Sequence, residues 1–366
     1  MPLRWGATSK NVNSPMFPRL LKLVLLLTFT HSMSRAQDKL PSPEMVQMYK
    51  NAEDDVARRD YAGAITICKQ ALVLAPGNTG FRRLQGKALY LAGNFSDAEA
   101  TFSTLVKEDS VDAESFRLLA LSEVALHHLP QAESTLAAAI SRFPSTGALY
   151  YEQGKIARLR EHKDKAVKSW LTGMEKDPGY APNYTAIANE DLPTDNLIWG
   201  LLYGETYLVM QHDTAGDDSM KRKLFAGWKT FFALLPEIST KKQTVFEKTF
   251  NGIFIKLTPV VSDGISTDNL VMVRTRFIMD WMSSYHKQLH VPLFEYHNKL
   301  LEEGKFEIYN EWLFGNAENE AQYHSWTEFH PGDIERFLEW RSKHPYLPAA
   351  TVDDPRNTNL HRGDQR

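Results

Sequence analysis

The chain of 366 residues contains a single cysteine, Cys68, and this scarcity excludes several classes of protein. One thiol cannot form an intramolecular disulfide, and paired-cysteine zinc sites need at least two. Nucleophile-elbow and glycine-rich dinucleotide-binding motifs are also absent from the sequence. We therefore expect a protein without enzymatic activity, with no catalytic residues and no cofactor.

Histidine spacing gives little reason to predict a metal site. His286 and His290 have the i, i+4 relation that places two rings on one helix face. A metalloprotease motif would carry Glu directly after the first His, where this chain has Lys287. We expect these side chains to be solvated or packed, and no metal to be bound.

Acidic residues are missing from the first 36 positions, which carry five basic ones. An apolar run over residues 20–29 follows Arg19 and precedes small residues at Ser34 and Ala36, the pattern of a signal peptide cleaved after Ala36. The run is shorter than the roughly 20 residues of a membrane span. Translation from Met16 would give a leader of ordinary length. No cysteine lies directly after the run, so lipid attachment is not expected, and the pattern predicts an exported protein, periplasmic or secreted.

Cleavage at this point changes the charge balance of the protein. Removing five basic residues from the 42 of the whole chain leaves 37 against 45 acidic ones, a formal charge of −8. A net negative charge disfavours nonspecific binding to nucleic acid, which depends on phosphate neutralisation. It also supplies no polybasic anchor for anionic lipids.

A 34-residue period runs through the first half of the chain. Alanine recurs at that spacing at Ala64, Ala98, Ala132 and Ala166. A second series of small residues has the same spacing, at Ala52, Gly86, Ala120, Gly154 and Ala188. A third series, mostly proline, consists of Pro76, Ser110, Pro144 and Pro178. Large residues alternate with the small ones, as at Cys68, Phe102, Leu136 and Trp170. Such self-similarity predicts stacked helical hairpins in which large side chains of one helix pack against small residues of another.

These positions resemble the tetratricopeptide repeat, which has a small residue in its first helix, an alanine in its second and a proline near its end. Four units match, at residues 45–78, 79–112, 113–146 and 147–180, followed by a fifth first helix at 181–189. The resemblance implies an all-α solenoid over residues 45–189 that binds partner proteins. Before it we expect a short linker at 37–44, and after it a divergent all-helical region at 190–347 and a disordered tail at 348–366.

The second half keeps a helical pattern without the 34-residue period. Apolar spacing predicts helices at residues 197–211, 219–235, 241–255, 269–290, 293–303, 306–314 and 331–343, the second of them closed by Pro236. Six of the eight tryptophans lie here, at Trp199, Trp228, Trp281, Trp312, Trp326 and Trp340. They indicate core filling, or alternatively a carbohydrate-binding surface on which rings stack. The carbohydrate-binding reading is the alternative function.

In tetratricopeptide repeats the first helices line a concave groove, with their second, fifth, ninth, twelfth and thirteenth positions pointing into it. Carried onto this chain, those positions include the candidate partner-binding residues Tyr49, Arg83, Lys87, Tyr90, Arg117, Tyr151, Lys155 and Arg158. Five basic residues stand there against two acidic ones, Glu53 and Glu114. Together with the predicted export signal and these basic residues, the resemblance leads us to expect a scaffold in the cell envelope whose groove binds exported or envelope proteins, through acidic or C-terminal peptides. The family's asparagine-based carboxylate clamp is missing, and the default interpretation of the basic side chains is that they are ordinary solvated groups.

Overall fold

The computed structural model describes residues 42–211, 217–346 and 348, and in these residues every regular element is helical. The predicted all-α fold is therefore confirmed. The expected signal peptide with its cleavage site after Ala36 and the expected tail beyond Pro348 lie outside the described residues. The last two linker positions, residues 43 and 44, already belong to the first helix.

The first half consists of four helical hairpins. Their helices are α1 (Pro43–Ala57), α2 (Tyr61–Leu74), α3 (Thr79–Leu91), α4 (Phe95–Leu105), α5 (Ala113–Ala125), α6 (Leu129–Arg142), α7 (Gly147–Leu159) and α8 (Lys163–Lys176). A fifth first helix, α9 (Pro182–Asp191), follows. Several begin at a side chain that caps a free backbone N–H, as Asn78 does for α3 and Asp112 for α5.

The alternation of small and large residues holds the hairpins together. A Cβ added at Gly86 would lie 2.8 Å from the Phe102 ring, and one at Gly154 would lie 2.1 Å from Trp170 Nε1. The backbones of paired helices can therefore approach only because these positions carry no side chain. Cys68 occupies the corresponding large position in the first unit, where it is fully buried and burial raises the pKa of its thiol to about 12. It acts as a core side chain.

The second half forms a helical lobe. It contains α10 (Leu197–Met210), α11 (Asp218–Ile238), α12 (Val245–Ile255), η1 (Thr258–Val261), α13 (Thr267–Ser284), α14 (Pro292–Glu302), α15 (Phe306–Asn310), the π-helical η2 (Glu311–Gly315), α16 (Asn316–Glu318), α17 (Glu320–Phe329) and α18 (Asp333–Lys343). The prediction that Pro236 ends its helix was wrong, since α11 continues to Ile238. The helix ends two residues after this proline.

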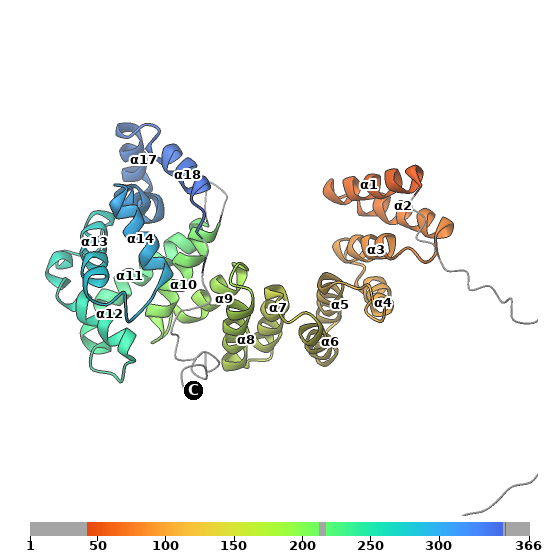
Figure 1. Cartoon of the computed structure of the whole chain (residues 1–366), viewed down its shortest axis with the longest axis horizontal. Helices are drawn as coiled ribbons and strands as arrows, with labels where there is room; N and C mark the ends of the chain where they lie inside the picture. Colours follow the sequence, from red (N-terminus) through yellow and green to blue (C-terminus); the bar gives the residue numbers. More distant parts are fainter. Residues whose placement is uncertain (1–41, 212–216, 347, 349–366) are drawn as a thin grey trace, which may run out of the picture.

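Figure 1 shows the hairpins arranged as an arc that leads into the lobe, with α3, α5 and α7 on its inner side and α4, α6 and α8 on its outer side. One hydrophobic core runs from Ala166 and Trp170 of α8 through α9 into α10 and the rest of the lobe. The arc is thus fixed to the lobe by shared packing. Among the described residues, no helix is both long and apolar enough to cross a bilayer.

Candidate functional site

The first helices α1, α3, α5 and α7 carry the candidate partner-binding side chains at matching positions of successive repeats. Tyr49, Arg83, Arg117 and Tyr151 follow one another at 34-residue intervals on α1, α3, α5 and α7, and all four are half-buried. Each therefore contacts its own helix layer while leaving part of its surface to solvent. Apolar groups accompany them: Val46, Leu91 and Leu159 are 53%, 40% and 62% exposed. The predicted groove positions thus combine aromatic, basic and apolar side chains.

Most of the basic groups in the groove carry ion pairs. Arg83 lies 3.0 Å from Asp112, which caps the next first helix. Arg117 of α5 reaches Glu152 of α7 at 3.1 Å, and Arg158 of α7 reaches Glu190 of α9 at 2.5 Å. These contacts connect α3, α5 and α7 each to the next first helix, so the arginines help to hold these repeats in register.

Two residues complete this charge pattern. Lys155 lies 3.0 Å from the second oxygen of Glu152 and 5.2 Å from the centre of the Tyr151 ring. Arg117 also makes a two-nitrogen contact with Glu114, and this hydrogen bond raises the pKa of its guanidinium. Lys87 differs from the others: it is exposed and, within the described residues, has no ion pair or hydrogen bond.

Each candidate tyrosine packs against an aromatic ring further along the chain, in the next unit for Tyr49 and within the same unit for Tyr90 and Tyr151. Tyr49 packs edge-on against Phe81 at 5.3 Å, and Tyr151 packs against Tyr180 at 6.1 Å. Tyr90 contacts Phe95 at 5.6 Å. Rings held in this way lose little freedom when a partner binds, which favours affinity.

The five groove positions considered from the sequence omit three carboxylates that matter here. Asp112, Glu152 and Glu190 stand at other positions of the repeat, yet each pairs with a basic group on the preceding first helix, which is α3, α5 or α7 respectively. A spacing signal was available for one of them, because Arg117 and Glu152 are one repeat plus one residue apart. The groove is therefore closer to neutral than its five positions alone indicate.

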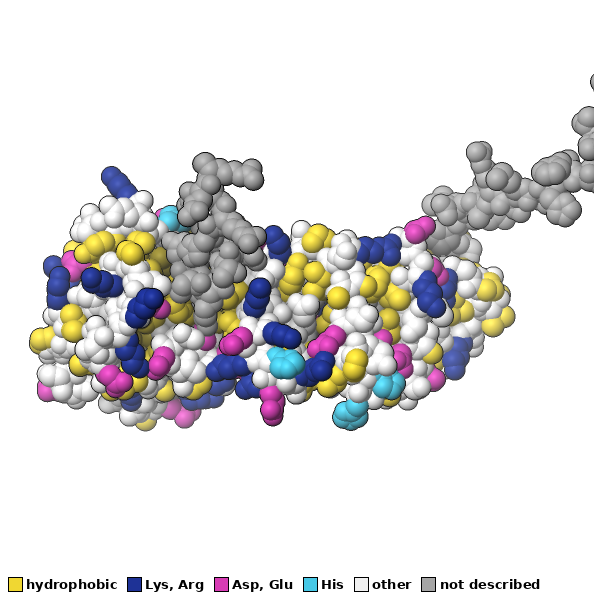
Figure 2. All heavy atoms as spheres, turned by 90° about the horizontal axis from the view of Figure 1, so that it is seen from below, with side chains coloured by type: hydrophobic (Ala, Val, Ile, Leu, Met, Phe, Trp, Pro, Cys, Tyr) yellow, Lys and Arg dark blue, Asp and Glu magenta, His cyan; other side chains and the backbone are white. Residues whose placement is uncertain are grey.

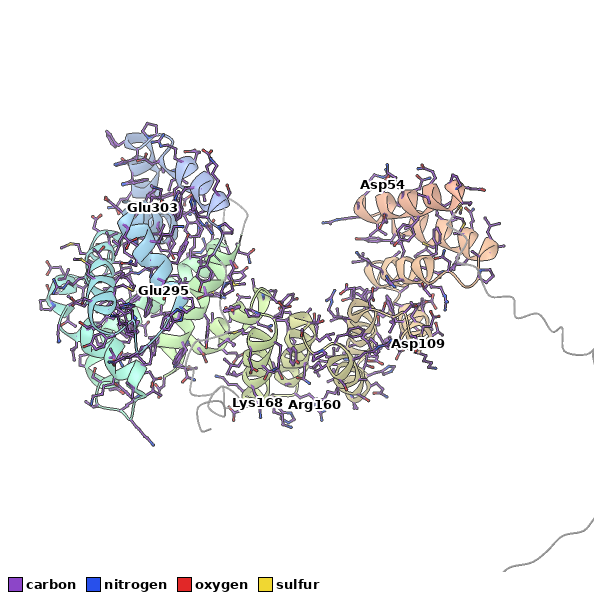
Figure 3. The ribbon with its side chains drawn as sticks, in the orientation of Figure 1. Asp54, Asp109, Arg160, Lys168, Glu295 and Glu303 are labelled. Atoms are coloured by element: carbon purple, nitrogen blue, oxygen red, sulfur yellow. The ribbon has the colours of Figure 1, made fainter. Side chains whose placement is uncertain are left out.

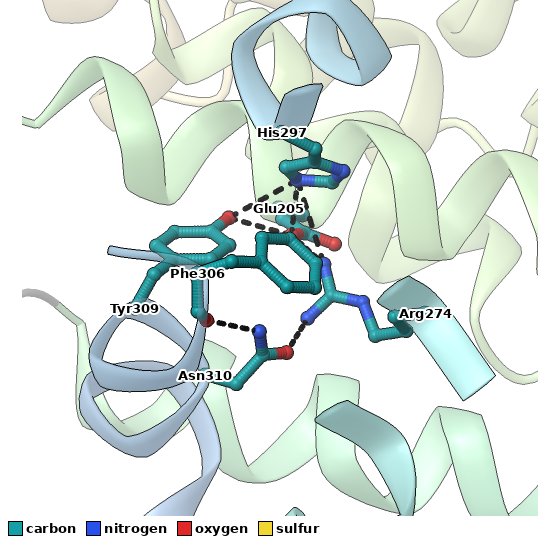
Figure 4. Close-up of polar contacts among 6 residues, drawn as sticks. All are labelled: Glu205, Arg274, His297, Phe306, Tyr309 and Asn310. Carbon is teal, nitrogen blue, oxygen red and sulfur yellow. Dashed lines mark hydrogen bonds and ion pairs between the residues drawn. The ribbon is translucent and has the colours of Figure 1, made fainter. Parts of the chain in front are cut away.

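A second polar cluster lies inside the lobe, where α10, α13, α14 and α15 meet (Figure 4). Oε1 of Glu205 accepts hydrogen bonds from Arg274, from His297 Nε2 at 2.8 Å and from the Tyr309 hydroxyl at 2.5 Å. Arg274 also donates to Asn310, whose amide nitrogen donates to the Phe306 carbonyl at 2.6 Å.

Burial and charge act in opposite directions on this cluster. Burial alone would raise the pKa of the Glu205 carboxyl, but Arg274 and His297 together lower that pKa to about 2. Burial lowers the pKa of His297 in spite of Glu205, so the imidazole is neutral at pH 7 and donates from Nε2. The cluster thus contains one ionised carboxylate and one guanidinium.

The cluster is closed to substrates. Glu205 and Arg274 are each 3% exposed, and the adjoining cavity, of about 20 Å³, has room for one water molecule. Rings of Trp228, Phe306, Tyr309 and Phe314 surround the guanidinium at 5.2–5.7 Å. This arrangement joins four helices of the lobe and offers no reacting surface.

The tryptophans of the second half do not line an open groove. Trp199, Trp228, Trp281 and Trp312 are at most 4% exposed. The other two tryptophans are half-buried, and each stacks on the histidine four residues later in the chain. The ring centroids of Trp326 and His330 lie 4.2 Å apart, and those of Trp340 and His344 lie 4.6 Å apart. Core filling explains four of the six, and the structure lends no support to the carbohydrate-binding alternative.

Comparison with known proteins agrees with the repeat pattern. Two models of the tetratricopeptide repeat match residues 55–122 and 117–181. No curated protein matches. The similar solved structures include the following three. The structure of MamA is 21% identical, covers 43% of this chain and 93% of its own, and has a TM-score of 0.38. The structure of a thermophilic TPR protein in Thermus thermophilus is 19% identical, covers 50% of this chain and 98% of its own, and has a TM-score of 0.42. The structure of a tetratricopeptide repeat protein from Parabacteroides merdae is 11% identical, covers 69% of this chain and 96% of its own, and has a TM-score of 0.40.

Proposed function

Because the solenoid of this chain belongs to the tetratricopeptide repeat family, we propose that the protein is an exported scaffold that binds a segment of a partner protein in its concave groove. Repeats of this family serve as protein-interaction surfaces, which supports the general role. Export and a place in the cell envelope rest on the N-terminal sequence pattern alone.

One observation carries the groove assignment. Half-exposed side chains at one repeat position form the row Tyr49, Arg83, Arg117 and Tyr151, with exposed Leu91 and Leu159 beside it. Tyrosine and arginine are the residue types that dominate protein-binding surfaces. A row of them along one face of four helices suits an extended or helical segment better than a small molecule.

The charges narrow the proposed partner to an acidic or C-terminal peptide. A carboxylate can bind Lys87 without displacing any existing contact. Arg83 and Lys155 would have to exchange Asp112 and Glu152 for the partner's carboxylates. Both pairs include partly exposed side chains, and such pairs contribute only about 0–1 kcal/mol, so this exchange has a low cost.

Affinity capture with charge-reversed variants tests the groove. We expect Lys87→Glu to weaken capture of the native partner about tenfold or more, because it removes one charge-assisted bond and adds repulsion. The pair Arg83→Glu with Lys155→Glu should abolish capture. Lys248→Glu with Lys256→Glu, on the exposed side of α12, makes the same change in net charge and serves as the control. Unchanged recovery in the groove variants, with helicity preserved, would refute the groove assignment.

The export part has a separate test. The N-terminus of the protein purified from its native source should be Gln37, determined by mass spectrometry. A chain that begins upstream of Gln37 would contradict cleavage after Ala36 and leave the groove proposal untouched.

A further inference from the structure

A cavity of about 420 Å³ lies on the outer side of the arc, between α6 and α8, with α7 beneath it. Its floor is apolar and comes from Leu136, Tyr150, Ile156 and Ala157, each at most 8% exposed as a residue. Its volume falls within the range of sites that accept a ligand or a partner's side chain. The cavity faces away from the concave groove and takes no part in the function proposed above.

The walls of the cavity are held rigidly. Trp170 of α8 fits against Gly154 of α7 and donates from Nε1 to the Tyr151 carbonyl at 3.1 Å. Ser169 donates to Gln153 at 3.0 Å, which ties the same two helices together at the cavity itself. A pocket whose walls do not need to move loses little free energy to ordering when it is filled.

The rim of the cavity is positively charged. Lys165 and Lys168 are exposed and have no ion pair within the described residues. On the opposite rim Glu133 is already paired with Arg160 at 2.5 Å. Figure 3 places Arg160 and Lys168 at the lower, outer edge of the arc, and Figure 2 shows Lys and Arg side chains in the middle of that face, interspersed with Asp, Glu and His side chains.

We propose that this outer pocket, defined by the floor of Leu136, Tyr150, Ile156 and Ala157 and by Lys165 and Lys168, is a second docking site for an acidic segment of a partner protein. The segment places one apolar side chain on the floor and carboxylates beside the two lysines. Charge complementarity selects this occupant, because the rim has two unpaired cations and its one carboxylate is neutralised. The protein would then hold two partners on opposite faces.

The test follows the methyl NMR signal of Ile156 in the full chain during titration with a peptide that has one leucine between pairs of glutamates. We expect saturable shifts at Ile156. They should be absent with lysine in place of glutamate and with glycine in place of leucine. Two exposed ion pairs contribute about 0.2–1 kcal/mol each, so Lys165→Glu with Lys168→Glu should weaken binding about 2- to 30-fold.

A second variant separates filling of the pocket from charge. The Thr172 hydroxyl donates only to the carbonyl of Lys168 in its own helix, so Thr172→Trp fills the cavity without breaking a contact between helices. It should abolish the Ile156 response. Lys248→Glu with Lys256→Glu and the groove variant Lys87→Glu should leave that response unchanged, which distinguishes this site from the proposed groove.

Several outcomes would overturn the proposal. The proposal fails if the Ile156 signal does not respond to the glutamate peptide. It also fails if the Lys165→Glu, Lys168→Glu variant binds that peptide as tightly as the unchanged chain does. Self-association that this variant abolishes in sedimentation would assign the pocket to a second copy of the chain. Tighter peptide binding after removal of residues 349–366 would assign it to the chain's own C-terminal segment.

Discussion

Replacing Glu205 by glutamine should destabilise the lobe strongly, although the two side chains have nearly the same shape. Glu205 is the only carboxylate that the structure pairs with Arg274 within the described residues, and both are 3% exposed. In the variant the guanidinium would keep Asn310 as a partner, but its charge would remain buried without a counter-charge. Removing one partner of a buried ion pair costs about 3–5 kcal/mol.

The loss can be measured by urea and thermal unfolding followed by near-UV circular dichroism, since the rings of Trp228 and Tyr309 lie around Arg274. A cost of about 3–5 kcal/mol corresponds to a fall in melting temperature of roughly 6–20 °C for a unit of 150–250 residues. The matched control is Arg276→Gln on the same helix, which breaks a pair with Asp280 in which Arg276 is 61% exposed. Such an exposed pair contributes about 0–1 kcal/mol.

The pH dependence gives a second readout of the same interaction. The pKa of Glu205 is lowered to about 2 in the folded protein, below the value of about 4.3 expected for an unfolded chain. Its stabilising contribution is therefore complete above pH ~4.3 and is lost as the pH falls toward 2. Glu205→Gln should lack this part of the acid dependence. A variant no less stable than Arg276→Gln would refute the reasoning.

Two further predictions concern small residues and a raised pKa. Gly154→Ala should lower the free energy of unfolding in urea by about 1–3 kcal/mol, because its Cβ would lie 2.1 Å from Trp170. The control Gly252→Ala, with no atom within 4 Å of the new Cβ, should raise that free energy by about 0.5–1 kcal/mol. Equal effects of the two substitutions would contradict the packing account. Burial, Asp268 and Glu318 raise the pKa of Glu311 to about 7. A raised pKa favours the folded state while the carboxyl is protonated and disfavours it above pH 7. Glu311→Gln should therefore stabilise the protein by about 1–2 kcal/mol at pH 8 and have little effect at pH 4, as measured by thermal melts, and a gain independent of pH would argue against it.

The solenoid could be predicted from sequence because its contacts recur at a fixed interval. Gly86 with Phe102 and Gly154 with Trp170 repeat one steric relation, so the 34-residue period reveals both the helices and their packing. Lobe helices were predicted less accurately. The predicted bounds of α10 and α14 lie within one residue of the observed ones. The prediction missed α17, however, and α13 ends at Ser284 rather than continuing to residue 290.

The buried cluster had no signal in the sequence. Glu205 and Tyr309 are 104 residues apart, and no periodicity connects them. The outer pocket also depends on the spacing of α6 and α8, which residue types alone do not determine. In the groove the candidate side chains remain a prediction, and the paired carboxylates such as Glu152 were omitted because a neighbouring repeat supplies them.

The core that α8 shares with α9 and α10 gives the solenoid two unequal ends. In a linear array each hairpin is stabilised mainly by its neighbours, and among the described residues α1 and α2 pack against one neighbouring hairpin while α7 and α8 pack against helices on both sides. Opening should therefore start at α1 and progress toward the lobe, with hydrogen exchange slowing in the same order. A partner lying along the groove would contact helices of low local stability near Tyr49 and helices of higher local stability near Tyr151. Such a gradient lets binding begin at the anchored end and order the rest as it proceeds.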